Sequence, residues 1–165
     1  MTTSEIQNNA SSQPLIEPDF ATGLDFLKSK IKTLPHQPGV YRMFDVADNC
    51  LYVGKARHLA RRVTSYTQPN RLSNRLMKMV ATTRRLEITV TNSEVEALLL
   101  ESNLIKQHRP RFNILLKDDK SFAHILITGD HPFPQMTKHR GAQKQKGEYF
   151  GPFASAGAVN RTLSS

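Results

Sequence analysis

The stretch from Gly39 to Arg62, GVYRMFDVADNCLYVGKARHLARR, constrains the fold of this chain more than any other. Its runs at 40–44 and 50–53 are rich in aromatic and β-branched residues, and the polar residues between them are typical of a tight turn. The pattern predicts a β-hairpin. Tyr41 and Tyr52 can then project to one side of adjacent strands, because side chains alternate along a strand.

Basic residues follow the hairpin directly. We expect Gly54 to let the backbone leave the sheet where a side chain would obstruct it. Lys55, Arg57, Arg61 and Arg62 come next, on a helix expected from Arg57 to about Tyr66. Two phenols beside a cationic helix face suit an anionic substrate such as a phosphodiester, although most tyrosines in strands serve packing alone.

The charge distribution favours a nucleic-acid partner. The formal net charge is +9, and the 31 residues from Lys55 to Arg85 contain nine Lys or Arg and no Asp or Glu. A phosphate backbone accounts for such a run better than a solvated surface does, and no basic amphipathic helix with large aromatics favours a membrane. The expected DNA contacts are Arg57, Arg61, Arg71, Arg75 and Lys78.

Cysteine content and hydropathy predict the compartment. The lone Cys50 excludes an internal disulfide framework and a cysteine-based zinc site, and it fits a reducing cytosol. The sequence shows no membrane-spanning run and no signal peptide. We therefore expect a cytoplasmic protein without a membrane partner.

The rest of the chain predicts one α/β domain. Residues 1–19 are polar and read as a disordered extension, residues 20–155 as the folded domain, and residues 156–165 as the start of a truncated segment. Within the domain, spacing predicts helices, strands and turns in the following order. Helices are expected at 20–34, 57–66, 71–80 and 93–108, strands at 86–91, 122–128 and 135–139, an extended piece at 112–115, a turn at 117–120, a basic loop at 141–147 and a turn-rich segment at 148–153.

Glu101 is the carboxylate that most invites a chemical role. It follows three leucines inside a helix that otherwise buries apolar groups, and an isolated carboxylate there is costly unless it is paired or binds a metal. A salt bridge to an arginine is one reading. The other is a Mg²⁺ site, since Mg²⁺ keeps several waters and takes further ligands from substrate phosphates. Such a site is expected to be weak until DNA is bound.

Phosphodiester hydrolysis would give the neighbouring side chains distinct roles. A cation on Glu101 could stabilise transition-state charge, and the guanidinium of Arg62 could hold a nonbridging oxygen. A tyrosine could be the general base, although a phenol with a pKa of about 10 is only about one-thousandth ionised at pH 7. Lys55 and the metal would have to lower that pKa, or the tyrosine would act through a water on the metal.

Five stretches carry a resemblance to a known family: GVYRMFD, LYVGKARHLARRV, EVEALLLESNLIK, RPRFNILLKDDKSF and KGEYFGPF. In this order, over about residues 35–155, they resemble the GIY-YIG nuclease superfamily and, within it, the UvrC family of nucleotide-excision-repair excinuclease subunits. Val40 and Val53 stand where the superfamily name has Ile, which is a conservative change. Leu104 stands where an aromatic residue is expected.

The resemblance implies a small α+β (α/β) GIY-YIG domain with a three-stranded antiparallel central sheet flanked by helices. It also implies a Mg²⁺- or Mn²⁺-dependent endonuclease that cuts damaged double-stranded DNA 3′ to the lesion. Further implied features are a monomeric domain and UvrB as a partner of the full-length protein, through a segment absent here. The implied active-site residues are Tyr41, Tyr52 (the base), Lys55, Arg62, Tyr66 and Asn113, with Glu101 as metal ligand and Gly39 and Gly54 as structural glycines.

Two alternatives remain open. A catalytically silent DNA-binding module would explain the basic run, with core tyrosines and an ion-paired Glu101, but not the joint occurrence of Tyr52, Arg62 and Glu101. A stand-alone repair nuclease of the same family would share the chemistry without a second nuclease domain. Substitution of Glu101 by Ala separates the nuclease from the silent module, because only the nuclease loses cleavage while it keeps DNA binding.

Overall fold

A computed structural model describes residues 17–113, 123–129, 135–153 and 156–164. The expectations for residues 1–16 and for the turn at 117–120 lie outside these residues. The elements are α1 (Phe20–Ile31), β1 (Gly39–Phe44), β2 (Cys50–Ala56), α2 (Leu59–Ser65), the 3₁₀ turn η1 (Pro69–Arg71), α3 (Asn74–Thr82), β3 (Arg85–Val90), α4 (Glu94–His108), β4 (Ala123–Thr128), β5 (Gln135–His139), β6 (Glu148–Phe153) and α5 (Ala156–Leu163).

The predicted hairpin is confirmed and forms the centre of the first sheet. Its strand order is β2-β1-β3, with both pairs antiparallel, so β2 and β3 are the edges. Asp45 closes the turn, because its Oδ1 accepts the peptide N–H groups of Ala47 and Asn49, each at 2.9 Å. This is the Asx-type side-chain bond that makes Asp favourable in turns.

The expectation that the chain leaves the sheet at Gly54 is wrong. Strand β2 continues to Ala56, and Gly54 lies opposite Tyr41 in the register. A Cβ on Gly54 would lie 2.3 Å from the hydroxyl oxygen of Tyr41. The glycine is therefore needed for the close approach of a tyrosine ring and not for a bend.

Helix α2 begins later than expected, at Leu59. The preceding residue, His58, is its N-cap, because its Nδ1 accepts the peptide N–H of Arg61 at 3.2 Å. An acceptor at this position satisfies one of the unpaired donors of the first turn. The helix buries Leu59 and Val63.

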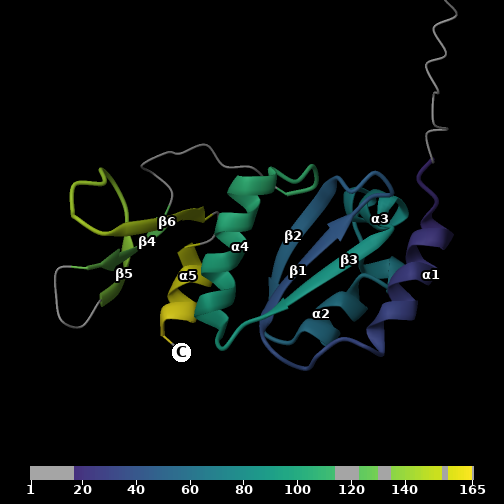
Figure 1. Cartoon of the computed structure of the whole chain (residues 1–165), viewed down its shortest axis with the longest axis horizontal. Coiled ribbons are helices and arrows are strands. Elements are labelled where there is room, and N and C mark those ends of the chain that lie inside the picture. Colours follow the sequence, from purple (N-terminus) through teal and green to yellow (C-terminus); the bar gives the residue numbers. More distant parts are fainter. Residues whose placement is uncertain (1–16, 114–122, 130–134, 154–155, 165) are drawn as a thin grey trace, which may run out of the picture.

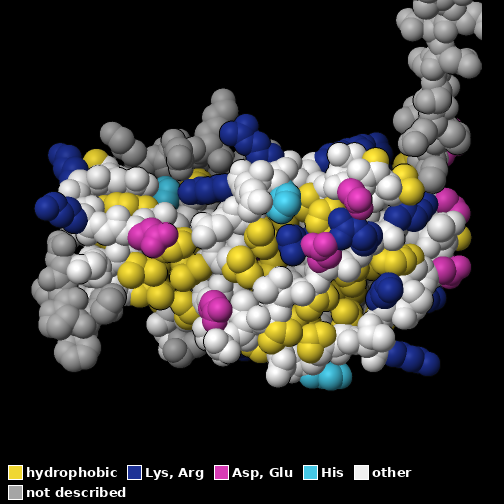
Figure 2. Space-filling view, in the orientation of Figure 1, with side chains coloured by type: hydrophobic (Ala, Val, Ile, Leu, Met, Phe, Trp, Pro, Cys, Tyr) yellow, Lys and Arg dark blue, Asp and Glu magenta, His cyan; other side chains and the backbone are white. Residues whose placement is uncertain are grey.

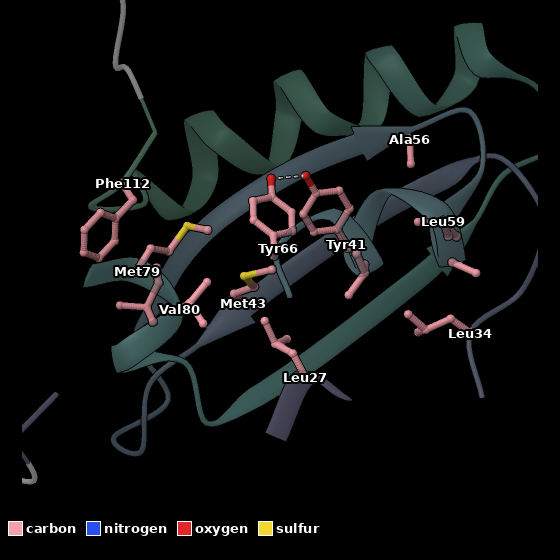
Figure 3. Packing of buried hydrophobic residues seen from close by; sticks show 13 residues of the cluster. Leu27, Leu34, Tyr41, Met43, Ala56, Leu59, Tyr66, Met79, Val80 and Phe112 are labelled. Carbon is pink, nitrogen blue, oxygen red and sulfur yellow. Dashed lines mark hydrogen bonds between the residues drawn. The ribbon is translucent and has the colours of Figure 1, made fainter. Parts of the chain in front are cut away.

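The main core lies between the first sheet and helices α1, α2 and α3. Figure 3 shows Leu27, Met43, Met79 and Val80 in one cluster with Tyr41 on this face of the sheet, and all five are fully buried. Burial of large apolar side chains is the main stabilising contribution to such a fold.

Helix α4 covers the opposite face of the first sheet and also supports a second sheet (Figure 1). Val40 and Val53 pack with Leu104 on one side of the helix. On its other side Leu98 packs with Ile125. A helix with apolar groups on both sides separates two packed layers, which places its residues at the centre of the molecule.

The second sheet was only partly predicted. Its order is β5-β4-β6, again antiparallel, and the strands expected at 122–128 and 135–139 are found as β4 and β5, which pair with each other. The segment 148–153, expected to be turn-rich, is strand β6. The extended piece expected at 112–115 is described only for Phe112 and Asn113, which form a turn beside β2. No helix in the described ranges is long and apolar enough to cross a bilayer.

Candidate active site

Three tyrosines meet on the face of the first sheet that α1, α2 and α3 cover. Tyr41 comes from β1, Tyr52 from β2 and Tyr66 from the C-cap of α2, and their ring centroids are 5.8–6.3 Å apart. The hydroxyls of Tyr41 and Tyr66 form a 2.6 Å hydrogen bond, drawn in Figure 3. Tyr41 and Tyr66 are buried, whereas Tyr52 is partly exposed. Tyr52 is therefore the phenol of this cluster that a substrate could reach most easily.

Arg62 extends the tyrosine cluster toward solvent. Its Nε donates to the hydroxyl of Tyr41 at 3.3 Å, and its guanidinium carbon lies 5.4 Å from the ring centroid of Tyr66. The residue itself is exposed. A guanidinium fixed by a phenol and an aromatic face keeps free donors for an anion.

Glu101 reaches the same region from α4. Its Oε2 accepts the peptide N–H of Lys55 at 2.6 Å, and no donor among the described residues contacts its Oε1. Burial raises the pKa of the Glu101 carboxyl, while the N–H and the charge of Lys55 and the charge of Arg62 act in the opposite direction. The carboxylate is thus held in place by one oxygen and available through the other.

Electrostatics link Glu101 with the tyrosines. The pKa of Tyr52 is raised well above its ordinary value, first by burial and then by Tyr66 and Glu101, and Arg62 is the neighbour that lowers it. Burial also raises the pKa of Tyr41. The Tyr52 hydroxyl therefore lies close enough to Arg62 and Glu101 for their charges to act on it.

Asn113 binds the exposed edge of β2 with its side-chain amide. Its Oδ1 accepts the peptide N–H of Val53 at 2.8 Å, and its Nδ2 donates to the carbonyl of the same residue at 2.9 Å. The peptide N–H of Phe112 donates to the carbonyl of Leu51 at 2.9 Å. Asn113 therefore continues the ladder of an edge strand that would otherwise end in unpaired peptide groups.

Sequence reasoning missed Glu94, which begins α4. Its Oε1 lies 3.1 Å from Nζ of Lys55, and its Oε2 lies 3.1 Å from Nε of Arg57. The general preference for acidic residues in the first turn of a helix was the available signal, but it does not identify a partner.

The acid-free run is partly neutralised in three dimensions. Besides Lys55 and Arg57, Arg85 is paired: it contacts Asp48 at 2.9 Å. Figure 2 shows basic and acidic side chains intermixed on the face that carries β1, β2 and β3. All the predicted DNA contacts are exposed: Arg57, although it is paired with Glu94, Arg61 on α2, Arg71 at η1, and Arg75 and Lys78 on α3.

The site fits a cation that takes few protein ligands. No three His, Cys, Asp or Glu side chains in the described part of the chain are close enough to form a metal site of their own. Glu101 offers a mostly buried carboxylate whose Oε1 contacts no donor among the described residues. Mg²⁺ accepts such a site, because it is bound through one or two carboxylates together with waters and substrate phosphates.

Comparison with known proteins connects this geometry with a family. A family model described as the UvrC-like GIY-YIG domain matches residues 37–114. UvrABC system protein C of Paramagnetospirillum magneticum is 56% identical over 157 residues, which cover 95% of this chain and 24% of that protein. The chain thus spans about a quarter of the length of this relative.

Solved structures show the same similarity. The GIY-YIG N-terminal endonuclease domain of UvrC from Thermotoga maritima, as a single-tyrosine variant bound to the catalytic divalent cation, is 35% identical, with a TM-score of 0.50. The match covers 54% of this chain and 96% of that domain. Another structure of the Thermotoga domain, bound to magnesium, has 35% identity and a TM-score of 0.49 over 53% of this chain and 96% of that domain.

Proposed function

The chain belongs to the UvrC-like GIY-YIG family, and on this premise we propose that it is a divalent-metal-dependent DNA endonuclease domain. Its proposed substrate is a phosphodiester on the 3′ side of a lesion in double-stranded DNA. UvrB is the proposed partner of the longer protein to which such a domain belongs. The observation that supports the chemistry best is the position of Glu101 near Tyr52 and Arg62, with Oε2 bound by the N–H of Lys55 and with no donor on Oε1 among the described residues.

Glu101 is proposed to hold the cation through Oε1. A bound Mg²⁺ or Mn²⁺ would supply Lewis-acid stabilisation of the negative charge that develops on the phosphate and the leaving oxygen. The peptide N–H of Lys55 keeps the carboxylate oriented. Because burial raises the pKa of Glu101, cation binding is favoured as pH rises through that pKa.

Arg62 is proposed to bind a nonbridging phosphate oxygen. Its Nε is directed to Tyr41, so the terminal nitrogens of the guanidinium remain available for an anion. Arg61, Arg71, Arg75 and Lys78 are proposed to contact the DNA backbone, where each contact contributes to salt-dependent affinity.

Tyr52 is proposed to accept the proton of the attacking water. Its partial exposure supports this choice over Tyr41 and Tyr66, which are buried and whose hydroxyls are hydrogen-bonded to each other. The ammonium of Lys55, which the sequence suggested as the activating charge, is paired with Glu94. Arg62 is therefore the side chain proposed to lower the pKa of Tyr52.

Asn113 is proposed to act by holding β2 in place. Its amide is fully engaged by the peptide group of Val53. Val53 lies between Tyr52 and Gly54, so this pair fixes the strand that presents the proposed base.

The proposal is tested by incision of an end-labelled duplex with one bulky lesion, using Mg²⁺ and the complete excinuclease. Glu101→Gln keeps an oxygen that can accept the Lys55 N–H but removes the charge. We expect the 3′ cut to disappear while DNA binding, measured in parallel, persists. Glu96→Gln is the matched control, because Glu96 is on the same helix and accepts from Asn92 instead. A 3′ cut that survives Glu101→Gln would indicate a silent DNA-binding module.

A further inference from the structure

Lys55 lies between two carboxylates of the same helix. Glu94 and Glu101 are seven residues apart on α4, which is about two turns, so both project from one face and are separated by about 10 Å along the axis. The peptide N–H of Lys55 binds Glu101, and its ammonium binds Glu94. The lysine side chain therefore extends along the helix, away from the carboxylate that holds its own backbone.

The pairing with Glu94 is well defined. The side chains of Lys55 and Glu94 are only 21% and 20% exposed, so solvent screens their attraction less than at an open surface. Arg57 occupies the second oxygen of Glu94, which fixes the carboxylate plane and directs Oε1 at Lys55. Although burial would raise the pKa of Glu94, its bonds to Lys55 and Arg57 bring that pKa below the ordinary value, so it stays ionised at neutral pH.

If the ammonium of Lys55 were not bound by Glu94, Glu101 is the carboxylate that it would contact. The backbone of Lys55 is already hydrogen-bonded to Glu101, and the charge of Lys55 already acts on it. An ammonium at the free Oε1 would take the lone pairs that a cation needs, and it would repel that cation.

We propose that Glu94 is a positioning residue that holds the ammonium of Lys55 away from Glu101 and thereby keeps Oε1 of Glu101 open to a divalent cation. This inference rests on the metal site of the proposed function. Glu94 touches neither the metal nor the substrate in this account and acts only through Lys55.

The test is a Mn²⁺ titration of the 165-residue chain without DNA, in which electron paramagnetic resonance measures the concentration of free Mn²⁺. Four proteins form a double-mutant cycle: wild type, Glu94→Gln, Lys55→Met and the double variant. We expect Glu94→Gln to weaken Mn²⁺ binding about tenfold in the wild-type background and to have no effect in the Lys55→Met background. Glu94→Ala serves as a second variant with the same expectation, because Ala favours helix.

The double-mutant cycle distinguishes two ways in which Glu94 could affect Mn²⁺ affinity: by holding the ammonium of Lys55, or only through its own negative charge. If Glu94 acted only through its long-range field, its removal would weaken binding by the same factor in both backgrounds, and that result would overturn the inference. Glu96→Gln removes a carboxylate from the same helical turn without contacting Lys55 and should leave the affinity nearly unchanged.

Failure of the metal site itself gives a different result. Glu101→Gln should abolish the Mn²⁺ site in otherwise wild-type protein. If wild type shows no site that depends on Glu101, the metal site is wrong and the inference falls with it. If such a site exists and Glu94→Gln leaves its affinity unchanged, only the role of Glu94 is wrong.

Discussion

The peptide N–H of Lys55 donates a 2.6 Å hydrogen bond to Oε2 of Glu101, and this bond joins the edge of β2 to the centre of α4. One oxygen of the carboxylate accepts a peptide N–H of the edge strand β2. The other contacts no donor among the described residues, as the proposed cation site requires. This contact fixes the position of Glu101. Because the donor is a peptide N–H and not a cationic side chain, the carboxylate is held without the charge neutralisation of a buried ion pair.

Glu101 is expected to reduce the stability of the metal-free protein at neutral pH. Folding raises the pKa of Glu101, so the folded state holds the protonated carboxyl more tightly than the unfolded state does. The stabilisation from this protonated form is fully present below the unfolded pKa and is lost as pH rises through the folded pKa. Glu101→Gln should therefore have the higher melting temperature at pH 7 without divalent cations, and the difference should shrink toward pH 4. Thermal melts across this range measure it. A variant that is less stable than wild type at pH 7 would contradict the account.

Gly54→Ala is expected to damage the site through Tyr41. The added Cβ would lie 2.3 Å from ring and hydroxyl atoms of Tyr41, a fully buried residue without space to yield. We expect a loss of about 1–3 kcal/mol in the free energy of unfolding, measured by urea denaturation, as for other overpacked cores. Gly129→Ala is the control, because no atom of the described residues lies within 4 Å of its Cβ position, and it should change stability by less than about 0.5 kcal/mol.

Tyr52 and Tyr66 should differ in what their hydroxyls do. Tyr66→Phe removes the buried 2.6 Å bond to Tyr41, and it should lower the free energy of unfolding by about 1 kcal/mol. Tyr52→Phe should lower the incision rate about a hundredfold or more, as expected for loss of a general base, with a smaller change in stability. Incision kinetics and denaturation curves on both variants test this. Full activity of Tyr52→Phe would remove Tyr52 as the base.

Asn113 is expected to stabilise β2 with both ends of its amide. Asn113→Ala leaves the peptide N–H and carbonyl of Val53 without their partner and should cost about 1–3 kcal/mol. Asn113→Asp keeps an acceptor for the N–H but places a carboxylate against the carbonyl oxygen, so it should not restore the loss. Chemical denaturation of the two variants measures both effects. Wild-type stability of Asn113→Ala would show that the pair contributes nothing.

Local sequence patterns predicted the parts of the fold that depend on local chemistry. The hairpin depends on alternating strand residues and on Asp45, and the start of α4 depends on Ser93, whose hydroxyl accepts the N–H of Glu96 at 3.1 Å. Strand β6 was missed because Gly151 and Pro152 favour turns. Its position at the edge of the second sheet explains why they are tolerated there.

The site was harder to predict because its decisive contacts join distant residues. Glu94 and Lys55 are separated by 39 positions, and nothing in a helix-starting glutamate indicates such a partner. Gly54 was misread because a glycine needed for close packing looks the same in a sequence as one needed for a bend. The resemblance implied an active-site role for Asn113, and only the structure shows its contact with Val53.

Binding of the proposed catalytic cation by Glu101 would be visible in a crystal of this chain soaked in Mn²⁺, with diffraction data at a wavelength where manganese scatters anomalously. We expect one strong anomalous peak within coordination distance of Oε1 of Glu101, and its loss in Glu101→Gln. A peak elsewhere with none at Glu101, or the ammonium of Lys55 in that position, would contradict it.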